Sequence, residues 1–324
     1  MKTKKIGLVG IYFPGAYDAL HENVPEGFEL VDALSPEAYG NLADCEYLIS
    51  RLDIDPDIIN HTPNVKFWQR WGAGFDHVDL KAWGERGIPI ATCPGVNSGI
   101  VAELAIMLML AGYRNLLQIN RQLRAGHWPR TEYFGRSFMI KGKTVGVLGL
   151  GHIGKKVAAL ASAFGANVIY YDIVRQPEQE EQFGYRFVDF DTLLKESDIF
   201  TIHCPLNEET RGMIGAAQFA KMKPTAMLIN TARGPIVDEA ALIDALTMGK
   251  IATAGLDTYE HEPLPKDHPL LTLDNVVASA HAGGNTKDND INMVNYVYHN
   301  IVAFDRGEPL NTPGDIVNGE YLKK

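Results

Sequence analysis

Three glycines between a strand pattern and a helix pattern constrain the fold of this chain more than any other feature. Gly149, Gly151 and Gly154 follow the apolar run 144–148 and precede the helix-like run 155–164. In this context the first glycine permits a tight turn, the second lets a pyrophosphate approach the backbone, and the third lets helix and strand pack closely. The pattern predicts a βαβ unit that binds a dinucleotide.

A second marker of the same site lies at the end of the next expected strand. The phosphates are expected at the helix N-terminus, on the N–H groups of His152 and Ile153. Asp172 closes the strand run 167–171, where a carboxylate accepts the ribose hydroxyls and repels a 2′-phosphate. The sequence therefore favours NAD over NADP. Arg175 keeps the NADP alternative open, because a nearby arginine can accommodate that phosphate.

Short apolar runs alternate with helix-like segments along most of the chain. The runs are continuous and rich in Val, Ile, Thr and aromatic residues, as expected for parallel strands covered on both faces. The expected strands are 6–9, 29–31, 47–50, 65–71, 89–92, 144–148, 167–171, 199–203, 226–230, 253–256 and 276–279. The expected helices are 100–123, 155–164, 238–249 and 285–306. With 324 residues, this pattern predicts an α/β protein of two open parallel-sheet domains.

Composition disfavours some classes of partner. The net charge of −10 disfavours binding to nucleic acid or to an anionic membrane. The most apolar stretch, 100–112, is interrupted by Glu103 and is too short to span a bilayer. It is expected to be a buried helix, either in one core or between domains or subunits. Cys45, Cys93 and Cys204 are scattered, which indicates a reducing, cytoplasmic setting and no metal site.

Three residue types suited to acid–base chemistry stand at the ends of later strand runs: Arg233, Glu262 and His281. An arginine offers a planar, permanently charged fork that matches a carboxylate. A histidine titrates near neutral pH, and a neighbouring carboxylate favours the imidazolium and orients the ring. Taken singly, each has an ordinary reading as a surface arginine, a solvated turn glutamate or a hydrogen-bonded structural histidine.

The segments around these residues resemble a known family. Residues 230–238, 255–264 and 279–284 are similar to the signatures of the D-isomer-specific 2-hydroxyacid dehydrogenases, including the phosphoglycerate dehydrogenases and the glyoxylate/hydroxypyruvate reductases. Segments 203–206, 210–214 and 222–224 match family patterns as well. The resemblance runs from about residue 65 to residue 281 and is most specific at the first three segments.

The resemblance implies a fold and an activity. A Rossmann NAD domain is expected at 99–289, inserted into a flavodoxin-like substrate domain formed by 1–98 and 290–324. The expected reaction is the NAD-dependent interconversion of a small anionic D-2-hydroxy acid and its 2-keto acid. The family also suggests a homodimer.

The resemblance also implies roles for individual residues. Arg233 would bind the substrate carboxylate and the reacting oxygen, His281 would be the general acid/base, and Glu262 its partner. Asp257 would hold the nicotinamide amide. Further cofactor contacts are expected from His203, Cys204, Pro205, Thr210, Thr231, Ala232 and Gly283.

Substrate-side contacts are expected from Ala73 and Gly74, in a glycine-rich loop whose N–H groups can converge on an anion. His77 stands where the family often has asparagine, and Trp68 and Trp71 are either core residues or make this region bulkier. Arg51 either faces a second anionic group of the substrate or is an exposed loop arginine.

Other readings of the chain stay open. Within the family, the same arginine and histidine can serve in oxidation of phosphite or formate, although Glu262 argues against the formate branch. Another possible function is that of a non-catalytic NADH-sensing scaffold. Such a protein would be similar to the corepressors of this fold, which bind short peptides. A relation to S-adenosylhomocysteine hydrolases is disfavoured by chain length and by the triad.

Overall fold

A computed structural model describes residues 3–51, 54–76 and 78–322 of the chain. The chain divides into two compact units. Unit 1 comprises residues 1–97 and 285–324, and unit 2 comprises residues 98–284. The expected boundaries were 98/99 and 289/290. The assignment of the two units as substrate and NAD domains stays a prediction at this point.

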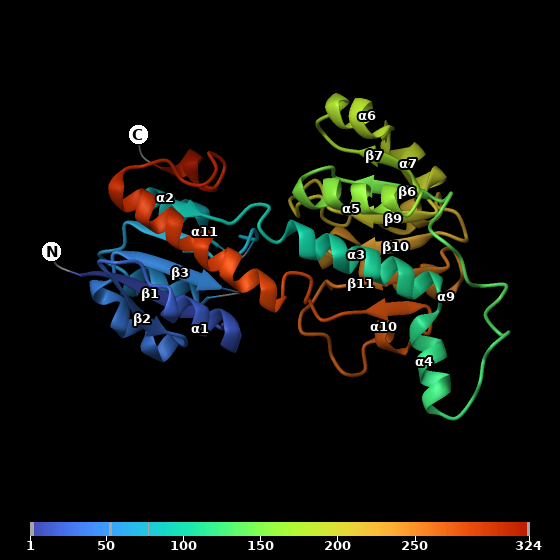
Figure 1. The fold of residues 1–324 in the computed structure, drawn as a ribbon, viewed down its shortest axis with the longest axis horizontal. Coiled ribbons are helices and arrows are strands. Elements are labelled where there is room, and N and C mark those ends of the chain that lie inside the picture. The colour runs from blue at the N-terminus through green and yellow to red at the C-terminus, as the bar shows by residue number, and fades with distance from the viewer. Residues whose placement is uncertain (1–2, 52–53, 77, 323–324) are drawn as a thin grey trace. The chain divides into compact units, whose positions relative to one another are not determined.

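Unit 1 is built on a five-stranded parallel sheet with the strand order β2-β1-β3-β4-β5. Figure 1 shows β2, β1 and β3 side by side in this sheet. Its strands are β1 (Lys4–Gly10), β2 (Phe28–Ala33), β3 (Tyr47–Arg51), β4 (Phe67–Arg70) and β5 (Ile90–Ala91). Its helices are α1 (Pro14–Glu22), α2 (Leu80–Glu85) and α11 (Lys287–Arg306), with short 3-10 turns η1 (Pro36–Asp44), η2 (Pro56–His61) and η4 (Gly319–Tyr321). This order is the flavodoxin-like one, as predicted.

Neighbouring residues of the central strands of unit 1 enter opposite layers of its core, because side chains alternate across a strand. Leu8 packs in the layer that contains α11, whereas Val9 packs with η1 on the other face. Ile49 and Leu48 divide in the same way. Coverage of both faces explains why the strand runs are continuously apolar.

The C-terminal segment of unit 1 extends its sheet. Ile316 forms an antiparallel bridge with Ala91 of β5, and Val317 N–H donates to Ile90 O at 2.9 Å. The Asn318 side chain accepts from Ile90 N–H and donates to Ile88 O. Residues 315–318 therefore cover the edge of the sheet that β5 would otherwise expose.

Unit 2 holds a seven-stranded parallel sheet with the order β12-β11-β10-β9-β6-β7-β8. Its strands are β6 (Thr144–Leu148), β7 (Asn167–Tyr171), β8 (Arg186–Phe187), β9 (Ile199–Ile202), β10 (Met227–Asn230), β11 (Thr253–Leu256) and β12 (Val276–Ala278). Its helices are α3 (Ser98–Tyr113), α4 (Leu116–Arg124), α5 (His152–Ala163), α6 (Pro177–Phe183), α7 (Phe190–Glu196), α8 (Ala216–Phe219), α9 (Glu239–Thr247) and α10 (Pro269–Thr272), with the 3-10 turn η3 (Gly234–Ile236). From β8 to β11 the order is that of the Rossmann fold, with β12 added. The predicted fold class is confirmed, although the sequence did not predict β8.

The helix expected at 100–123 is two helices. Asn115 has a φ of 50°, a left-handed conformation that ends α3, and α4 leaves at 63° to it. Helix α3 packs against α5, β10 and β11, which explains its apolar surface, and so the prediction of a buried helix is confirmed (Figure 1). Among the described residues no single helix is long and apolar enough to cross a membrane, and α3 with α4 reaches that length only as a bent pair.

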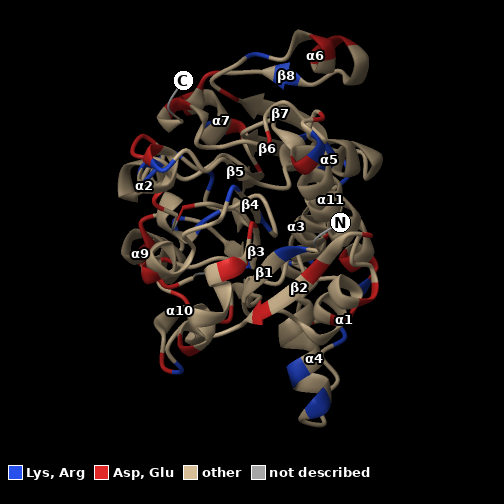
Figure 2. Ribbon diagram, turned by 90° about the vertical axis from the view of Figure 1, so that its left-hand side faces the viewer, with Lys and Arg blue, Asp and Glu red and all other residues tan. Residues whose placement is uncertain are grey.

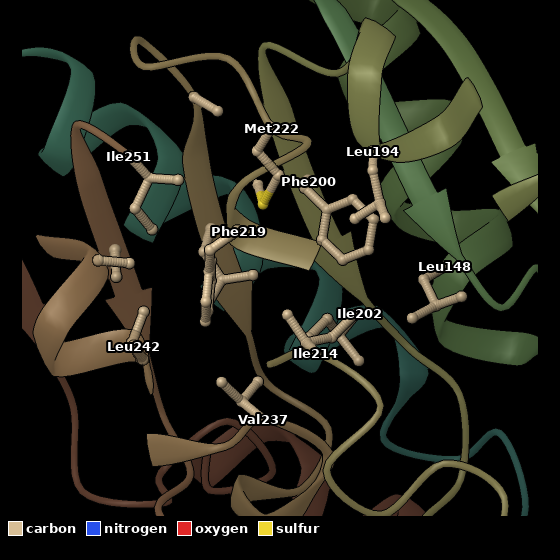
Figure 3. Close-up of a cluster of buried hydrophobic side chains, with 14 of the residues drawn as sticks. Leu148, Leu194, Phe200, Ile202, Ile214, Phe219, Met222, Val237, Leu242 and Ile251 are labelled. Carbon is tan, nitrogen blue, oxygen red and sulfur yellow. The ribbon is translucent and has the colours of Figure 1, made fainter. Parts of the chain in front are cut away.

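The opposite face of the unit 2 sheet is covered by a dense apolar layer. Figure 3 shows part of it, where Phe200 and Ile202 of β9 lie among Ile214, Phe219 and Met222. Phe200 is fully buried, and burying one such side chain is worth about 1.5–3 kcal/mol. This packing holds the strand ends, and hence the loops that follow them, in fixed positions.

Candidate active site

The chemistry-bearing loops of unit 2 all leave the same edge of the sheet, because its strands are parallel. Backbone hydrogen bonds tie each loop to its neighbour. His203 N–H donates to Leu148 O at 2.7 Å, and Asp257 N–H donates to Asn230 O at 2.9 Å. His281 N–H donates to Asp257 O at 2.9 Å. The edge includes the point between β6 and β9 where the strand order reverses, which is where ligands bind in such folds.

The glycine turn after β6 has the geometry that the motif predicts. Gly149 has a φ of 89°, and a Cβ there would lie 2.7 Å from Cys204 N. A Cβ on Gly154 would lie 2.0 Å from Gly149 O, where α5 leaves the turn. A Cβ on Gly151 would meet no described atom within 4 Å, so the backbone there is open to a ligand. The turn fits a pyrophosphate at the N-terminus of α5.

Two loops at this edge carry buried polar atoms that lack a hydrogen-bond partner within the described part of the chain. They are Thr231 Oγ1, after β10, and Thr258 Oγ1, after β11. An unsatisfied buried polar group costs about 1–3 kcal/mol, which a bound ligand can recover. These atoms are therefore consistent with a site completed by a cofactor.

His203, in the loop after β9, provides a third such atom. Its Nε2 lies 2.8 Å from Thr201 Oγ1, while its Nδ1 is buried and has no partner among the residues that the structure describes. Burial lowers the pKa of His203 to about 3, so the ring is neutral at physiological pH. Thr210, in contrast, uses its hydroxyl within its own loop, where it donates to Pro205 O at 2.7 Å.

Glu262 and His281 come together, as the sequence predicts. His281 Nδ1 lies 2.6 Å from Glu262 Oε2, and Tyr259 N–H donates to Glu262 Oε1 at 2.9 Å. Burial alone would raise the pKa of Glu262, but these hydrogen bonds and the charges of His281 and Arg233 lower it below its usual range. The carboxylate is therefore ionised at neutral pH. The His281 side chain stays 51% exposed, so its ring is accessible.

Arg233 belongs to a loop that is shaped by a side chain which sequence reasoning missed. Asn230 accepts from Ala232 N–H at 3.0 Å and donates to Arg233 O at 2.9 Å. A Cβ on Gly234 would lie 1.9 Å from Tyr259 O, so the loops after β10 and β11 are in direct backbone contact. This contact places Arg233 close enough to Glu262 to lower its pKa.

Asp257 and Tyr259 brace the segment that carries His281. The two carboxylate oxygens of Asp257 accept from Ala282 N–H and Gly283 N–H, both at 2.9 Å. Tyr259 Oη donates to Ser279 O at 2.6 Å. The expected contact of Asp257 with a nicotinamide amide stays a prediction, and its bracing role was not predicted.

A second carboxylate–imidazole pair supports the same loop and was also missed. Glu239 Oε1 lies 3.0 Å from His268 Nε2, and Glu239 Oε2 accepts from Glu260 N–H at 3.1 Å. Glu239 thus fixes the loop two residues before Glu262. The sequence feature that could have indicated this role is the position of Glu239 directly after Asp238, the N-cap of α9.

The expected substrate-side residues lie in unit 1. Arg51 ends β3 and is only 6% exposed. It donates to Ile11 O and to Asn285 Oδ1, both at 3.0 Å, and it stacks on Phe13. The alternative of an exposed loop arginine is therefore wrong.

The other unit 1 candidates follow β4. Ala73 is exposed and Gly74 is half-buried, in a loop that opens with Gly72 at a φ of 124°. Trp68 is a core residue that donates to Ser50 Oγ at 2.7 Å, and Trp71 is half-buried. His77 lies outside the described residues. A contact of Arg51, Ala73 or Gly74 with substrate stays a prediction.

The fold and the glycine turn define a dinucleotide-binding α/β protein, and comparison with known proteins specifies its class. Residues 106–283 match the family model of the D-isomer specific 2-hydroxyacid dehydrogenase, NAD binding domain. A glyoxylate reductase of Korarchaeum cryptofilum is 39% identical over 86% of this chain and 85% of that protein. A D-3-phosphoglycerate dehydrogenase of Archaeoglobus fulgidus is 43% identical over 81% of this chain, but this chain spans only 49% of it.

A solved structure agrees with these sequence matches. The crystal structure of a glyoxylate reductase from Paecilomyes thermophila superposes with a TM-score of 0.83 at 32% identity, covering 97% of this chain and 99% of that one. The chain therefore belongs to the D-isomer specific 2-hydroxyacid dehydrogenase family. Its unit 2 contains the NAD-binding domain of the family, and NAD is its cofactor.

Proposed function

We propose that the chain interconverts a small D-2-hydroxy acid and its 2-keto acid, with Arg233, His281 and Glu262 as the residues that act on the substrate. The observation that carries the proposal is the 2.6 Å contact between His281 Nδ1 and an ionised Glu262, at the sheet edge that also holds the glycine turn. Such a pair orients an imidazole for proton transfer. The names of the relatives, glyoxylate reductase and D-3-phosphoglycerate dehydrogenase, support a substrate of this kind.

In the proposed reduction, each residue has a separate task. The guanidinium of Arg233 holds the substrate carboxylate and polarises the carbonyl oxygen. His281 donates a proton to that oxygen, and Glu262 stabilises the imidazolium that must be present beforehand. Bound NADH supplies the hydride. In the reverse direction His281 removes the hydroxyl proton, so oxidation needs the neutral ring.

The residues of this chain fit the cofactor at three places. The open backbone at Gly151 and the N-terminus of α5 would hold the pyrophosphate, at His152 and Ile153. Asp172 would accept the ribose hydroxyls. The nicotinamide end would be lined by residues near the ends of β10 to β12, namely the buried hydroxyl of Thr231 with Ala232, Asp257 and Gly283. The part of the cofactor between the ribose and the nicotinamide would be covered by His203, Cys204 and Pro205.

The proposal is tested by following the loss of NADH absorbance with a panel of 2-keto acids. Glyoxylate, hydroxypyruvate, pyruvate, phosphohydroxypyruvate and longer apolar acids should include at least one substrate turned over at about 1–10³ per second. Arg233→Lys should raise KM and lower kcat, because a point charge cannot replace a bidentate fork. Tight NADH binding without turnover of any acid would instead favour the non-catalytic scaffold.

We also propose that the chain forms a homodimer through α4 and the segment that follows it. Apolar side chains there are exposed: Leu116, Leu123, Trp128, Phe134 and Met139. Trp128 is 80% exposed, and such a group of exposed apolar residues is typical of a surface that is covered by a partner. Within unit 2, α4 extends away from the sheet, which suits it to reach a second copy (Figure 1).

A further inference from the structure

The loop after β7 carries the two residues that bear on the choice between NAD and NADP. Asp172 Oδ2 accepts from Leu150 N–H at 2.6 Å, and its Oδ1 accepts from Val174 N–H at 3.1 Å. The carboxylate is thus fixed against the glycine turn, where a ribose would lie. Three residues later stands Arg175, whose side chain is 61% exposed and bears the positive charge that a 2′-phosphate would require.

Arg175 is held by a glutamate from the next helix. Its Nε donates to Glu180 Oε1 at 2.9 Å, and its Nη2 donates to Glu180 Oε2 at 2.8 Å. Two parallel charge-assisted bonds of this kind fix both the position and the plane of a guanidinium. The same guanidinium lies 5.7 Å from the centre of the Phe187 ring. The guanidinium of Arg175 is therefore already paired with a carboxylate, although its side chain stays exposed.

Glu180 is itself anchored. Tyr170 Oη donates to Glu180 Oε1 at 2.8 Å, and Gln176 N–H donates to Tyr170 Oη at 2.8 Å. Tyr170 is fully buried in β7, so this network connects the pair to the core. The hydrogen bonds from Arg175 and Tyr170 lower the pKa of Glu180 to about 2, and it stays ionised at all pH values at which the enzyme would work. Helix α6 also carries Glu178 and Glu181, and Figure 2 shows this acidic helix.

We propose that Glu180 determines cofactor specificity by binding Arg175. The positive charge of this loop is then not available to a 2′-phosphate at the ribose end of the site. The inference rests on the proposed function, because it takes the glycine turn and Asp172 as the dinucleotide site. The ion pair is thus a second cause of the preference for NAD, besides the repulsion of a 2′-phosphate by Asp172. A purely structural role for the pair would affect the binding of NADH and NADPH alike.

The test is to compare the binding of the two dinucleotides in Glu180→Gln. This change keeps the shape of the side chain and an acceptor for Tyr170, but it removes the charge that holds Arg175. The dissociation constants of NADH and NADPH are measured on the full chain without substrate, by nicotinamide fluorescence. NADPH should bind about tenfold more tightly than to the parent protein, whereas the affinity for NADH should change less than about twofold.

Two further variants isolate the cause. Glu181→Gln makes the same change of charge on the same helix at an exposed position, and it should leave the ratio of the two dissociation constants at the parent value. The double variant Glu180→Gln/Arg175→Ala should lose the gain in NADPH affinity, because the released cation is absent. Thermal unfolding of each variant shows whether it is folded.

An unchanged ratio in a folded Glu180→Gln, or a gain that persists in the double variant, would overturn the inference while leaving the proposed function intact. A parent protein that binds neither dinucleotide would overturn the proposed function, and the inference with it.

Discussion

At the scale of single residues, the pairing of His281 depends on how its backbone is held. His281 has a φ of 50°, an uncommon conformation for a residue with a side chain. The hydrogen bonds of Asp257 to the two following N–H groups hold that conformation, and Tyr259 holds the preceding strand end. The imidazole is thereby directed to Glu262 before any substrate binds, which is how catalytic groups gain from preorganisation.

We predict that Glu262→Gln lowers kcat for keto-acid reduction by about 10²-fold and changes its pH dependence. The pKa of Glu262 is lowered in the folded protein. Its carboxylate therefore stays ionised through the usual carboxyl range and loses its charge only when the pH falls through the lowered pKa. Without that charge the imidazolium loses its partner. The alkaline limb of the pH–rate profile should therefore move to lower pH.

The control for this measurement is Glu260→Gln, an exposed carboxylate two residues away in the same loop. The pH–rate profile of this variant should match that of the unaltered protein. A Glu262→Gln profile that overlays the unaltered one would show that Glu262 has no electrostatic role toward His281.

The sequence predicted the glycine turn and the meeting of Glu262 with His281, but not the residues that support them. The glycines are predictable because a tight turn and close packing demand residues without a Cβ. Asn230, Tyr259 and Glu239 act through backbone N–H and C=O groups, and these contacts depend on the path of the loops. That path follows from tertiary packing and has no local signal in the sequence.

At the scale of elements, the candidate site depends on contact between successive loops. The loops after β10 and β11 touch at Gly234, where there is no space for a Cβ beside Tyr259 O. Arg233 precedes this glycine, and Glu262 follows Tyr259 by three residues. The position of one functional group is thus linked to the position of the other.

We predict that Gly234→Ala lowers kcat/KM by at least about tenfold and lowers the melting temperature, because the added methyl group must push the two loops apart. Gly215→Ala is the matched control. Its φ of −118° suits any residue, and the nearest atom to the new Cβ lies 3.7 Å away. Activity of both variants is measured with the best substrate of the panel. Equal activity in the two variants would contradict the proposed linkage of the loops.

Strands were predicted better than helix ends. Eleven of the twelve strands that the structure describes overlap expected runs, which are apolar because helices or turns cover both faces of each sheet. The break between α3 and α4 was missed, because Asn115 occurs within a run of helix-compatible residues and its left-handed conformation leaves no compositional mark. β8 was missed because Arg186 interrupts the apolar residues around it, so no continuous apolar run marks the strand.

At the scale of the whole molecule, the proposed dimer makes a prediction of its own. Sedimentation should give twice the mass of one chain, and Trp128→Asp should shift the equilibrium to the monomer, because a charge would be buried without a partner. Met248→Asp introduces the same charge at another exposed apolar position, 68% exposed at the end of α9, and should leave the mass unchanged. A monomeric parent protein would refute the proposal.

The sheet edge formed by residues 315–318 has a consequence for how the chain is made. Unit 2 is one continuous segment, so all its strands can pair once residue 284 has left the ribosome. Unit 1 must wait, because β5 receives its last neighbour from a segment synthesised more than two hundred residues later. During translation unit 2 can reach its native core first, while the sheet of unit 1 remains unfinished until residues 315–318 have been synthesised.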